Sequence, residues 1–178
     1  MSNPDAQRDF WVFGYGSLMW RPGFDFLERR PARLPGAHRA LCVYSHIHRG
    51  TPEKPGLVLG LDRGGSCRGI AFRIAKRGRD ATLSYLRERE QVTKVYRETF
   101  RLIDLLDEPR ERVRALCYLV DRAHAQYAGD LSLETQLHLV RQGHGRSGIN
   151  RDYVLATAKE LAALGIRDRT FEWLAARL

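Results

Sequence analysis

The chain has 178 residues, of which 43% are apolar and 10% aromatic, which is enough to bury a core and too apolar for an intrinsically disordered chain. Its formal net charge of +9 suits an anionic partner: nucleic acid, an anionic membrane surface or a small acidic substrate. The arginines are spread along the whole chain and accompany no nucleic-acid-binding motif, so we expect solvated basic faces and no nucleic-acid partner.

The chain shows no secretion-signal pattern and no apolar run long enough to cross a bilayer, so we expect a cytoplasmic protein without a membrane partner. Residues 1–9 are polar and predict a loosely ordered lead-in, whereas residues 10–178 contain neither repeat nor linker and predict a single domain. Cys42, Cys67 and Cys117 are odd in number and lie in apolar segments, so we expect buried free thiols and no disulfides. The pattern does not determine an oligomeric state.

Apolar runs bounded by Gly, Pro and Asp dominate the first two thirds of the chain and predict strands. We expect these at residues 10–15, 40–45, 57–61, 67–74, 99–106 and 113–120. Apolar residues spaced three and four apart predict helices at residues 80–90, 133–142, 151–164 and 168–177. Strands early and helices late favour an α+β fold, a curved and largely antiparallel sheet or small barrel packed by helices.

The first expected strand breaks into the turn Gly14-Tyr15-Gly16-Ser17. Glycines at the end of a buried strand let backbone N–H groups approach a bound anion, although a plain β-turn explains the segment equally well. The turn lacks the Gly-Lys-Ser/Thr of a Walker loop and the third glycine of a dinucleotide fingerprint. Ser17 lies in no Gly-x-Ser-x-Gly elbow, so we interpret it as a hydrogen-bond donor rather than a nucleophile.

The helix expected over residues 80–90 carries a carboxylate on its apolar face. With Leu83 as the reference for this face and 100° per residue, Glu90 lies about 20° from Leu83 around the helix axis, whereas Glu88 lies about 140° from it. Burial raises the pKa of a carboxyl toward the range useful for proton transfer, so Glu90 is a candidate acid/base. The alternative, which this helix alone favours, is a buried salt bridge with Arg87, Arg89 or Arg97.

Two further patterns carry weaker hypotheses. His46 and His48 alternate at the end of a strand, but no other ligand stands at a spacing that completes a metal site, so we expect no metal. Asn150 follows a glycine turn and is expected to cap the next helix, with a ligand-facing Tyr153 as the alternative role for this segment.

Four blocks in this order resemble the ChaC family of γ-glutamylcyclotransferases, and together they cover about residues 11–165. They are residues 12–20, residues 48–56, residues 85–90 with Tyr96-Arg97, and residues 147–153. The resemblance implies the γ-glutamylcyclotransferase-like fold, a small mixed β-barrel with flanking helices, and cleavage of glutathione to 5-oxoproline and cysteinylglycine. The chain departs from the family at Met19, where Ile is common, and at Gln91–Val95, where some members have a shorter Gly-rich spacer.

The resemblance also implies roles for individual residues. Glu90 corresponds to the catalytic acid/base, and Tyr96 and Tyr153 are candidates for lining the pocket. The segment implied to bind substrate comprises Val12, Phe13, Gly14, Tyr15, Gly16, Ser17 and Leu18. Glutathione is the implied small-molecule substrate, and no cofactor is implied. A cyclotransferase for other γ-glutamyl peptides or γ-glutamylamines and a non-enzymatic regulator of cation transport are the alternatives.

Overall fold

The computed structural model describes residues 8–91 and 93–178, so most of the lead-in expected over residues 1–9 lies outside the described residues. Strands dominate the first two thirds of the chain and helices the last third, as the sequence predicted. In chain order they are β1 (Phe10–Gly14), the 3-10 turn η2 (Ser17–Met19), β2 (Glu28–Ser45), β3 (Gly56–Ile74), η3 (Lys76–Gly78), α1 (Arg79–Glu90), β4 (Tyr96–Leu105), β5 (Arg112–Val120), α2 (Leu133–Gln142), β6 (His144–Gly145), β7 (Gly148–Ile149), α3 (Asn150–Ala163) and α4 (Arg169–Ala175).

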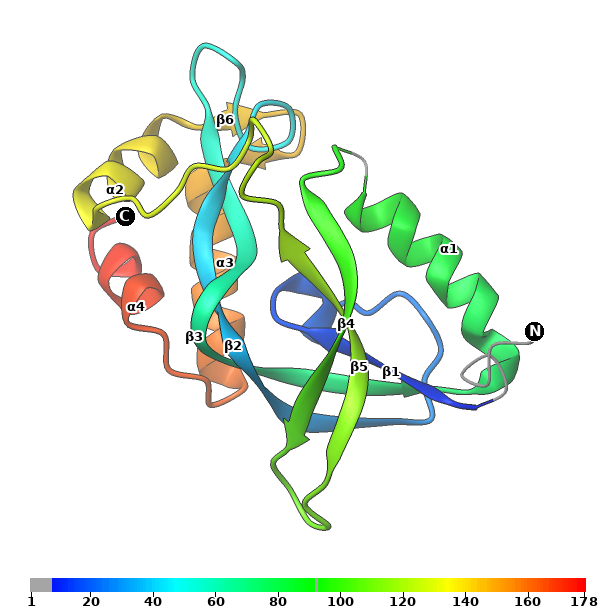
Figure 1. Cartoon of the computed structure of the whole chain (residues 1–178). Helices are drawn as coiled ribbons and strands as arrows, with labels where there is room; N and C mark the ends of the chain where they lie inside the picture. Colours follow the sequence, from blue (N-terminus) through cyan, green and yellow to red (C-terminus); the bar gives the residue numbers. More distant parts are fainter. Residues whose placement is uncertain (1–7, 92) are drawn as a thin grey trace. The chain divides into compact units, whose positions relative to one another are not determined.

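Five strands form a closed barrel in the order β1-β3-β2-β4-β5 (Figure 1). The pairs β1–β3, β2–β4 and β4–β5 are antiparallel, whereas the β1–β5 pair that closes the barrel is parallel. A closed barrel leaves no strand edge exposed, which lets five strands bury a core. The predicted α+β fold, a small mixed barrel with helices, is therefore confirmed.

Contacts within the chain divide it into two compact units. The first contains Met1–Arg39 and Leu61–Asp121, which includes β1, β4, β5 and α1. The second contains Ala40–Gly60 and Arg122–Leu178, which includes α2, α3 and α4. Because β2 and β3 each continue from one unit into the other, the backbone is continuous between the units. The prediction of one domain over residues 10–178 stays a prediction.

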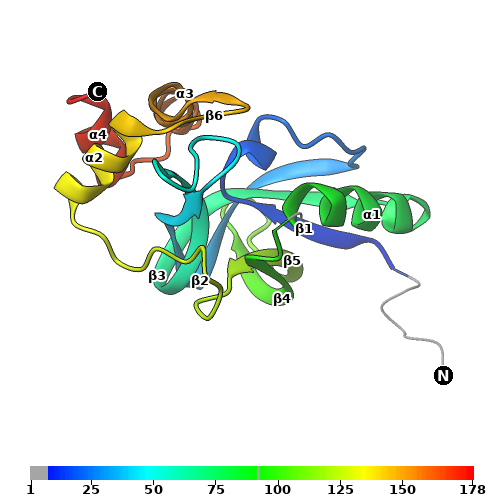
Figure 2. The same cartoon turned by 90° about the horizontal axis from the view of Figure 1, so that it is seen from above.

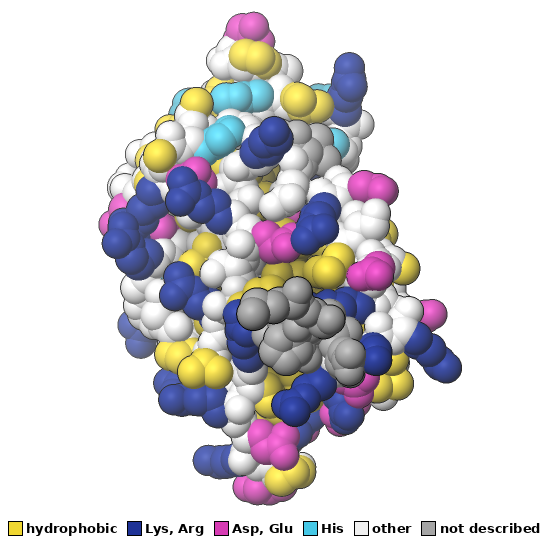
Figure 3. Space-filling view, turned by 45° about the vertical axis from the view of Figure 1, so that its right-hand side comes forward, with side chains coloured by type: hydrophobic (Ala, Val, Ile, Leu, Met, Phe, Trp, Pro, Cys, Tyr) yellow, Lys and Arg dark blue, Asp and Glu magenta, His cyan; other side chains and the backbone are white. Residues whose placement is uncertain are grey.

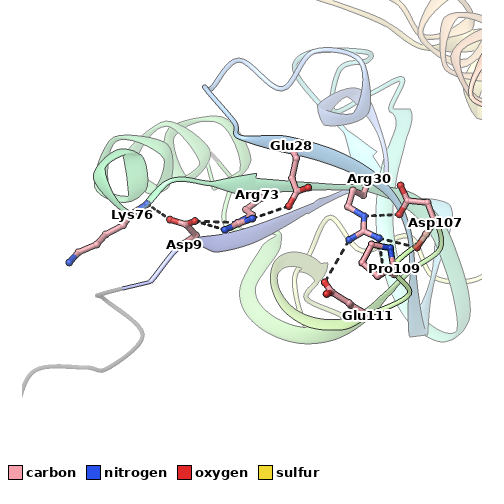
Figure 4. A network of polar contacts seen from close by, with 8 residues as sticks. All are labelled: Asp9, Glu28, Arg30, Arg73, Lys76, Asp107, Pro109 and Glu111. Carbon is pink, nitrogen blue, oxygen red and sulfur yellow. Dashed lines mark hydrogen bonds and ion pairs between the residues drawn. The ribbon is translucent and has the colours of Figure 1, made fainter.

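In the first unit, charged side chains on the strands and on the segments that adjoin them neutralise one another (Figure 4). Arg73 of β3 pairs with Asp9 at 2.9 Å and with Glu28 at 3.2 Å. Arg30 of β2 is 8% exposed, and its guanidinium donates to the Asp107 carboxylate at 2.7 Å. A buried arginine is tolerated only when its donors are satisfied, so this pairing lets β2 carry Arg30 at an inward position.

In the second unit, α2, α3 and α4 pack against one another and lie together in both views (Figures 1 and 2). Their buried contacts come from apolar residues at helical spacing, as the sequence predicted. These side chains, each at most 2% exposed, are Val140, Val154, Leu161, Phe171 and Leu174.

Two strands are longer than predicted. β2 begins at Glu28 instead of residue 40. Its first half alternates buried and exposed residues, as a strand does. The sequence did not show this alternation because Arg30 occupies a buried position and the prolines occupy exposed ones. β3 joins the two strands predicted at 57–61 and 67–74, because Gly64 and Gly65 keep the chain in the ladder with φ of +105° and +65°.

Candidate active site

The glycine turn follows β1 directly, and the strand that leads into the turn belongs to the core. The Val12 and Phe13 side chains are 0% and 1% exposed, so they support the turn from within the barrel. A Cβ on Gly14 would lie 3.1 Å from the Cβ of Leu18, which is closer than ordinary side-chain contact allows. Gly16 has φ of −133°, so the turn uses no left-handed glycine at this position.

Backbone hydrogen bonds tighten the turn into η2. The Met19 N–H donates to the Gly16 carbonyl at 2.9 Å, and the Arg21 N–H donates to the Ser17 carbonyl at 2.7 Å. The carbonyl of the buried Tyr15 accepts a hydrogen bond from Arg39 Nε at 2.6 Å. The N–H groups of Ser17 and Leu18 lie in the first turn of η2, where a helix offers no intrahelical acceptor.

Glu90 is the last residue of α1, and its side chain is 17% exposed. Burial raises the pKa of its carboxyl, and the charge of the neighbouring Arg89 opposes that effect. Glu88 is exposed, and its carboxylate lies 3.5 Å from the Ser84 hydroxyl. The predicted difference between the two glutamates is therefore confirmed.

The arginines expected as salt-bridge partners are used in different ways. Arg87 donates two hydrogen bonds to Glu98, at 2.9 and 3.0 Å, and Arg97 pairs with Asp121 at 2.7 Å. Nε of Arg89 lies 3.5 Å from Oε1 of Glu90. This distance is longer than those of the Arg87–Glu98 and Arg97–Asp121 pairs, at 2.9 and 2.7 Å, and longer than a strong charge-assisted hydrogen bond.

Arg89 joins the glycine turn to the end of α1. Its Nη2 donates to the Ser17 hydroxyl at 2.6 Å, while its Nη1 donates to the Arg21 carbonyl at 2.7 Å and to the Tyr85 hydroxyl at 2.9 Å. One guanidinium thus contacts both the turn and Glu90, two features that the sequence singled out separately.

A second network lies between α1 and the barrel. The Tyr118 hydroxyl donates to Glu98 at 3.2 Å, and Glu98 also accepts from Arg87. Burial raises the pKa of Tyr118, and the charges of Glu98 and Glu90 raise it further. Tyr96 is half-buried and lies two residues before Glu98 on β4, opposite Val120 of β5.

The sequence interpretation missed both Glu98 and Tyr118. They face each other across the β4–β5 ladder, in register. This register depends on strand pairing, for which the linear sequence carried no local signal.

The segment around Asn150 belongs to the second unit and differs from its prediction. Asn150 is 0% exposed, and its amide group pairs with both backbone groups of Leu57, accepting at 2.7 Å and donating at 2.8 Å. Its side chain therefore caps no helix, and α3 begins at Asn150 with Ile149 at the capping position. The predicted cap is wrong because Asn150 satisfies a distant strand instead.

Tyr153 lies one turn further along α3. Its hydroxyl accepts a hydrogen bond from the Leu59 N–H at 3.1 Å, and the Arg49 guanidinium lies 5.3 Å from its ring centre. Through these contacts Tyr153 joins α3 to β3 and to Arg49 within the second unit. Its role in substrate binding stays a prediction.

The remaining sequence hypotheses concern histidines, cysteines and charge. His48 Nδ1 lies 2.9 Å from the Ser147 hydroxyl, and His46 stacks on Tyr44. Within residues 8–91 and 93–178, no three His, Cys, Asp or Glu side chains are grouped so that they could hold a metal ion. On the face shown in Figure 3, Lys and Arg side chains are dispersed among acidic and apolar ones.

The three cysteines are buried and free, as predicted. Burial raises the pKa of Cys117 to about 12, which makes its thiol a poor nucleophile. In the described part of the chain, no helix combines the length and the apolar character needed to cross a membrane.

Comparisons with known proteins identify the family and the fold. The glutathione-specific γ-glutamylcyclotransferase of Escherichia coli K12 is 36% identical over 158 residues, covering 89% of this chain and 68% of the relative. Human glutathione-specific γ-glutamylcyclotransferase 1 is 31% identical over 165 residues, covering 92% of this chain and 74% of the relative. A crystal structure of a yeast γ-glutamyl cyclotransferase specific to glutathione shares the fold, with a TM-score of 0.84 at 20% identity over 95% of both chains. The family model of the ChaC-like proteins matches residues 10–177, and the chain therefore belongs to the ChaC-like protein family.

Proposed function

We propose that this protein is a γ-glutamylcyclotransferase that cleaves glutathione to 5-oxoproline and cysteinylglycine. The observation that carries the proposal is Glu90: a half-buried carboxyl whose pKa burial raises, contacted by the guanidinium that also holds the glycine turn. Its place in a family with relatives named for this reaction supports the same conclusion. The three buried free thiols suit the reducing cytoplasm, where we expect the reaction to occur.

The reaction is a ring closure within the γ-glutamyl group. Glu90 takes a proton from the α-ammonium, and the resulting amine attacks the γ-carbonyl carbon, so that the ring C–N bond forms. The tetrahedral intermediate then breaks its bond to the cysteinyl nitrogen, to which Glu90 returns a proton. In total the ring nitrogen loses two protons and the departing amine gains two, so the reaction consumes no water and requires no cofactor.

The protein contributes orientation and electrostatics to this chemistry. Because amine and carbonyl belong to one molecule, the pocket needs only to hold the rotamer in which they meet. We propose that backbone N–H groups of Tyr15-Gly16-Ser17-Leu18 bind either the α-carboxylate or the developing oxyanion. Loss of one such donor typically costs about 3 kcal/mol in the transition state. Tyr96 and Tyr153 are further proposed substrate-binding residues, on the family resemblance.

Mass spectrometry after incubation with glutathione in ¹⁸O-labelled water tests this function. Cyclisation yields unlabelled 5-oxoproline and cysteinylglycine, whereas hydrolysis yields labelled glutamate. We expect the unlabelled products without added metal and in the presence of a chelator. The Glu90→Gln protein, prepared in the same way, controls for contaminating enzymes.

N-acetylated glutathione provides the matched substrate control. Its α-nitrogen is blocked, so we expect no turnover. Hydrolysis of this compound to N-acetylglutamate would contradict cyclisation and would restore Ser17 as a candidate nucleophile. A preference for γ-glutamylamines over glutathione would keep the mechanism and change the substrate class.

A further inference from the structure

Besides its ion pair with Glu90, Arg89 makes hydrogen bonds to several other residues. Its guanidinium reaches three segments: the Ser17 hydroxyl of the turn, the Arg21 carbonyl after η2, and the Tyr85 hydroxyl on α1. The planar fork of arginine has donors in fixed directions, so three simultaneous contacts set the position of each partner. Nη2 of this guanidinium donates to the Ser17 hydroxyl, and its Nε lies 3.5 Å from Oε1 of Glu90, so one planar group contacts both the turn and the carboxylate.

Tyr85 extends the same contact surface by one helical turn. It lies four residues before Arg89 on α1, and its ring packs against Phe24 with centroids 6.3 Å apart. Gly23 has φ of +73°, and a Cβ there would collide with the Tyr85 hydroxyl. Contacts of Ser17, Arg21 and Phe24 with Arg89 and Tyr85 therefore hold this segment against α1. A side chain at Gly23 would displace the Tyr85 hydroxyl.

We propose that Arg89 is a positioning residue: it fastens the turn at Ser17 to the end of α1 and so sets the distance between the turn's backbone and the Glu90 carboxylate. This inference rests on the proposed function and adds to it a residue that does not need to touch the substrate. Four of the five N–H groups of an arginine suffice for the contacts described, which leaves little capacity for binding a ligand. Its side chain is 23% exposed, consistent with a largely internal role.

The charge of Arg89 has a second, separable effect. It lowers the pKa of Glu90 against the larger effect of burial, and so favours the ionised carboxylate, which is the form that accepts a proton. The other groups in this region are Tyr118 of β5, whose pKa the charge of Glu90 raises, and the Glu98–Arg87 pair between β4 and α1. Charge and geometry can be distinguished because lysine retains the first and loses the second.

Amide hydrogen exchange in the substrate-free protein tests the fastening without any assumption about the reaction. We expect the hydrogen-bonded amides of residues 19–21 to exchange at least tenfold faster in Arg89→Lys and Arg89→Met than in the parent. Arg110→Met is the matched control, since Arg110 is an exposed arginine with a side chain 77% accessible and its loss also removes one charge. Unchanged exchange at residues 19–21 in both Arg89 variants overturns the proposal.

Kinetics then test the consequence. A displacement of about 1 Å in a catalytic geometry can cost about 10²-fold, so we expect kcat/KM to fall by about that factor in both variants. The acid limb of the pH profile should shift to higher pH in Arg89→Met but remain in place in Arg89→Lys. Parental kcat/KM in Arg89→Lys, despite faster exchange at the turn, also overturns the proposal.

A double-mutant cycle assigns the effect to the Arg89–Ser17 contact. If the contact carries the positioning, Ser17→Ala and Arg89→Lys lower kcat/KM by much less together than the product of their separate effects. Strict multiplicativity of the two effects overturns it. Absence of glutathione turnover in the parent protein would instead refute the proposed function, while the exchange measurement would still decide whether Arg89 fastens the turn.

Discussion

Glu90→Gln separates catalysis from stability at one position. Glutamine keeps the size and hydrogen-bonding capacity of the side chain but cannot cycle a proton. General acid–base catalysis is commonly worth about 10² to 10⁴-fold, so we expect the turnover of glutathione to fall by at least 10²-fold. Glu88→Gln is the matched control, because Glu88 lies on the same helix and is exposed to solvent.

The same substitution should stabilise the fold at neutral pH. Folding raises the pKa of Glu90 above its ordinary value of 4.5, because burial outweighs the opposing charge of Arg89. The folded chain therefore binds this proton more tightly than the unfolded chain, and the free energy of unfolding decreases as the pH rises from 4.5 through the raised pKa. At pH 7 the ionised carboxylate lowers the free energy of unfolding by about 1.4 kcal/mol for each factor of ten by which folding increases its proton affinity.

Glutamine carries no charge to bury, so Glu90→Gln recovers this free energy at pH 7 and leaves stability nearly unchanged below about pH 4. In a chain of this size, each kcal/mol corresponds to roughly 2–4 °C in Tm. Thermal unfolding of parent, Glu90→Gln and Glu88→Gln at both pH values, together with a glutathione assay, measures both effects. A Glu90→Gln protein that is inactive and also less stable at pH 7 would show a structural carboxylate, and an inactive Glu88→Gln would show that the wrong glutamate was assigned.

Three further predictions address the surroundings of the site. In the parent protein, the acid limb of kcat/KM should lie above the ordinary carboxyl pKa of 4.5, since Glu90 must be ionised to accept a proton; a pH profile with its limb at or below 4.5 would contradict this. Glu98→Gln should lose about 1–3 kcal/mol of unfolding free energy at pH 7. This loss should diminish as the pH falls through the pKa of Glu98, which the Arg87 hydrogen bond lowers; an equal loss in Tm at pH 7 and pH 3 would exclude the explanation. Asn150→Ala leaves both backbone groups of Leu57 without their partner and should cost about 2–5 kcal/mol in urea unfolding, whereas a cost near 1 kcal/mol is that of a helix cap.

The direction of Glu90 could be predicted from sequence because helical periodicity is a local property. Residues three and four apart share a face whatever the rest of the chain does, so the contrast between Glu90 and Glu88 required no tertiary information. The glycine turn after β1 was readable for a similar reason, since an apolar run followed by two closely spaced glycines is a local turn signal. The ordered blocks then indicated the ChaC-like family and its barrel, and the structure and the comparisons agree.

Contacts between distant segments were decided by the tertiary structure alone. The Arg89–Ser17 hydrogen bond joins residues 72 positions apart, and the pairing of Asn150 with Leu57 joins residues 93 apart. Arg30 occupies a buried strand position because Asp107, 77 residues later, neutralises its charge and the Pro109 carbonyl accepts a further hydrogen bond from it. Local pattern reports which way a side chain faces, but the partner it meets depends on strand register and helix docking, and these follow from closing the whole barrel.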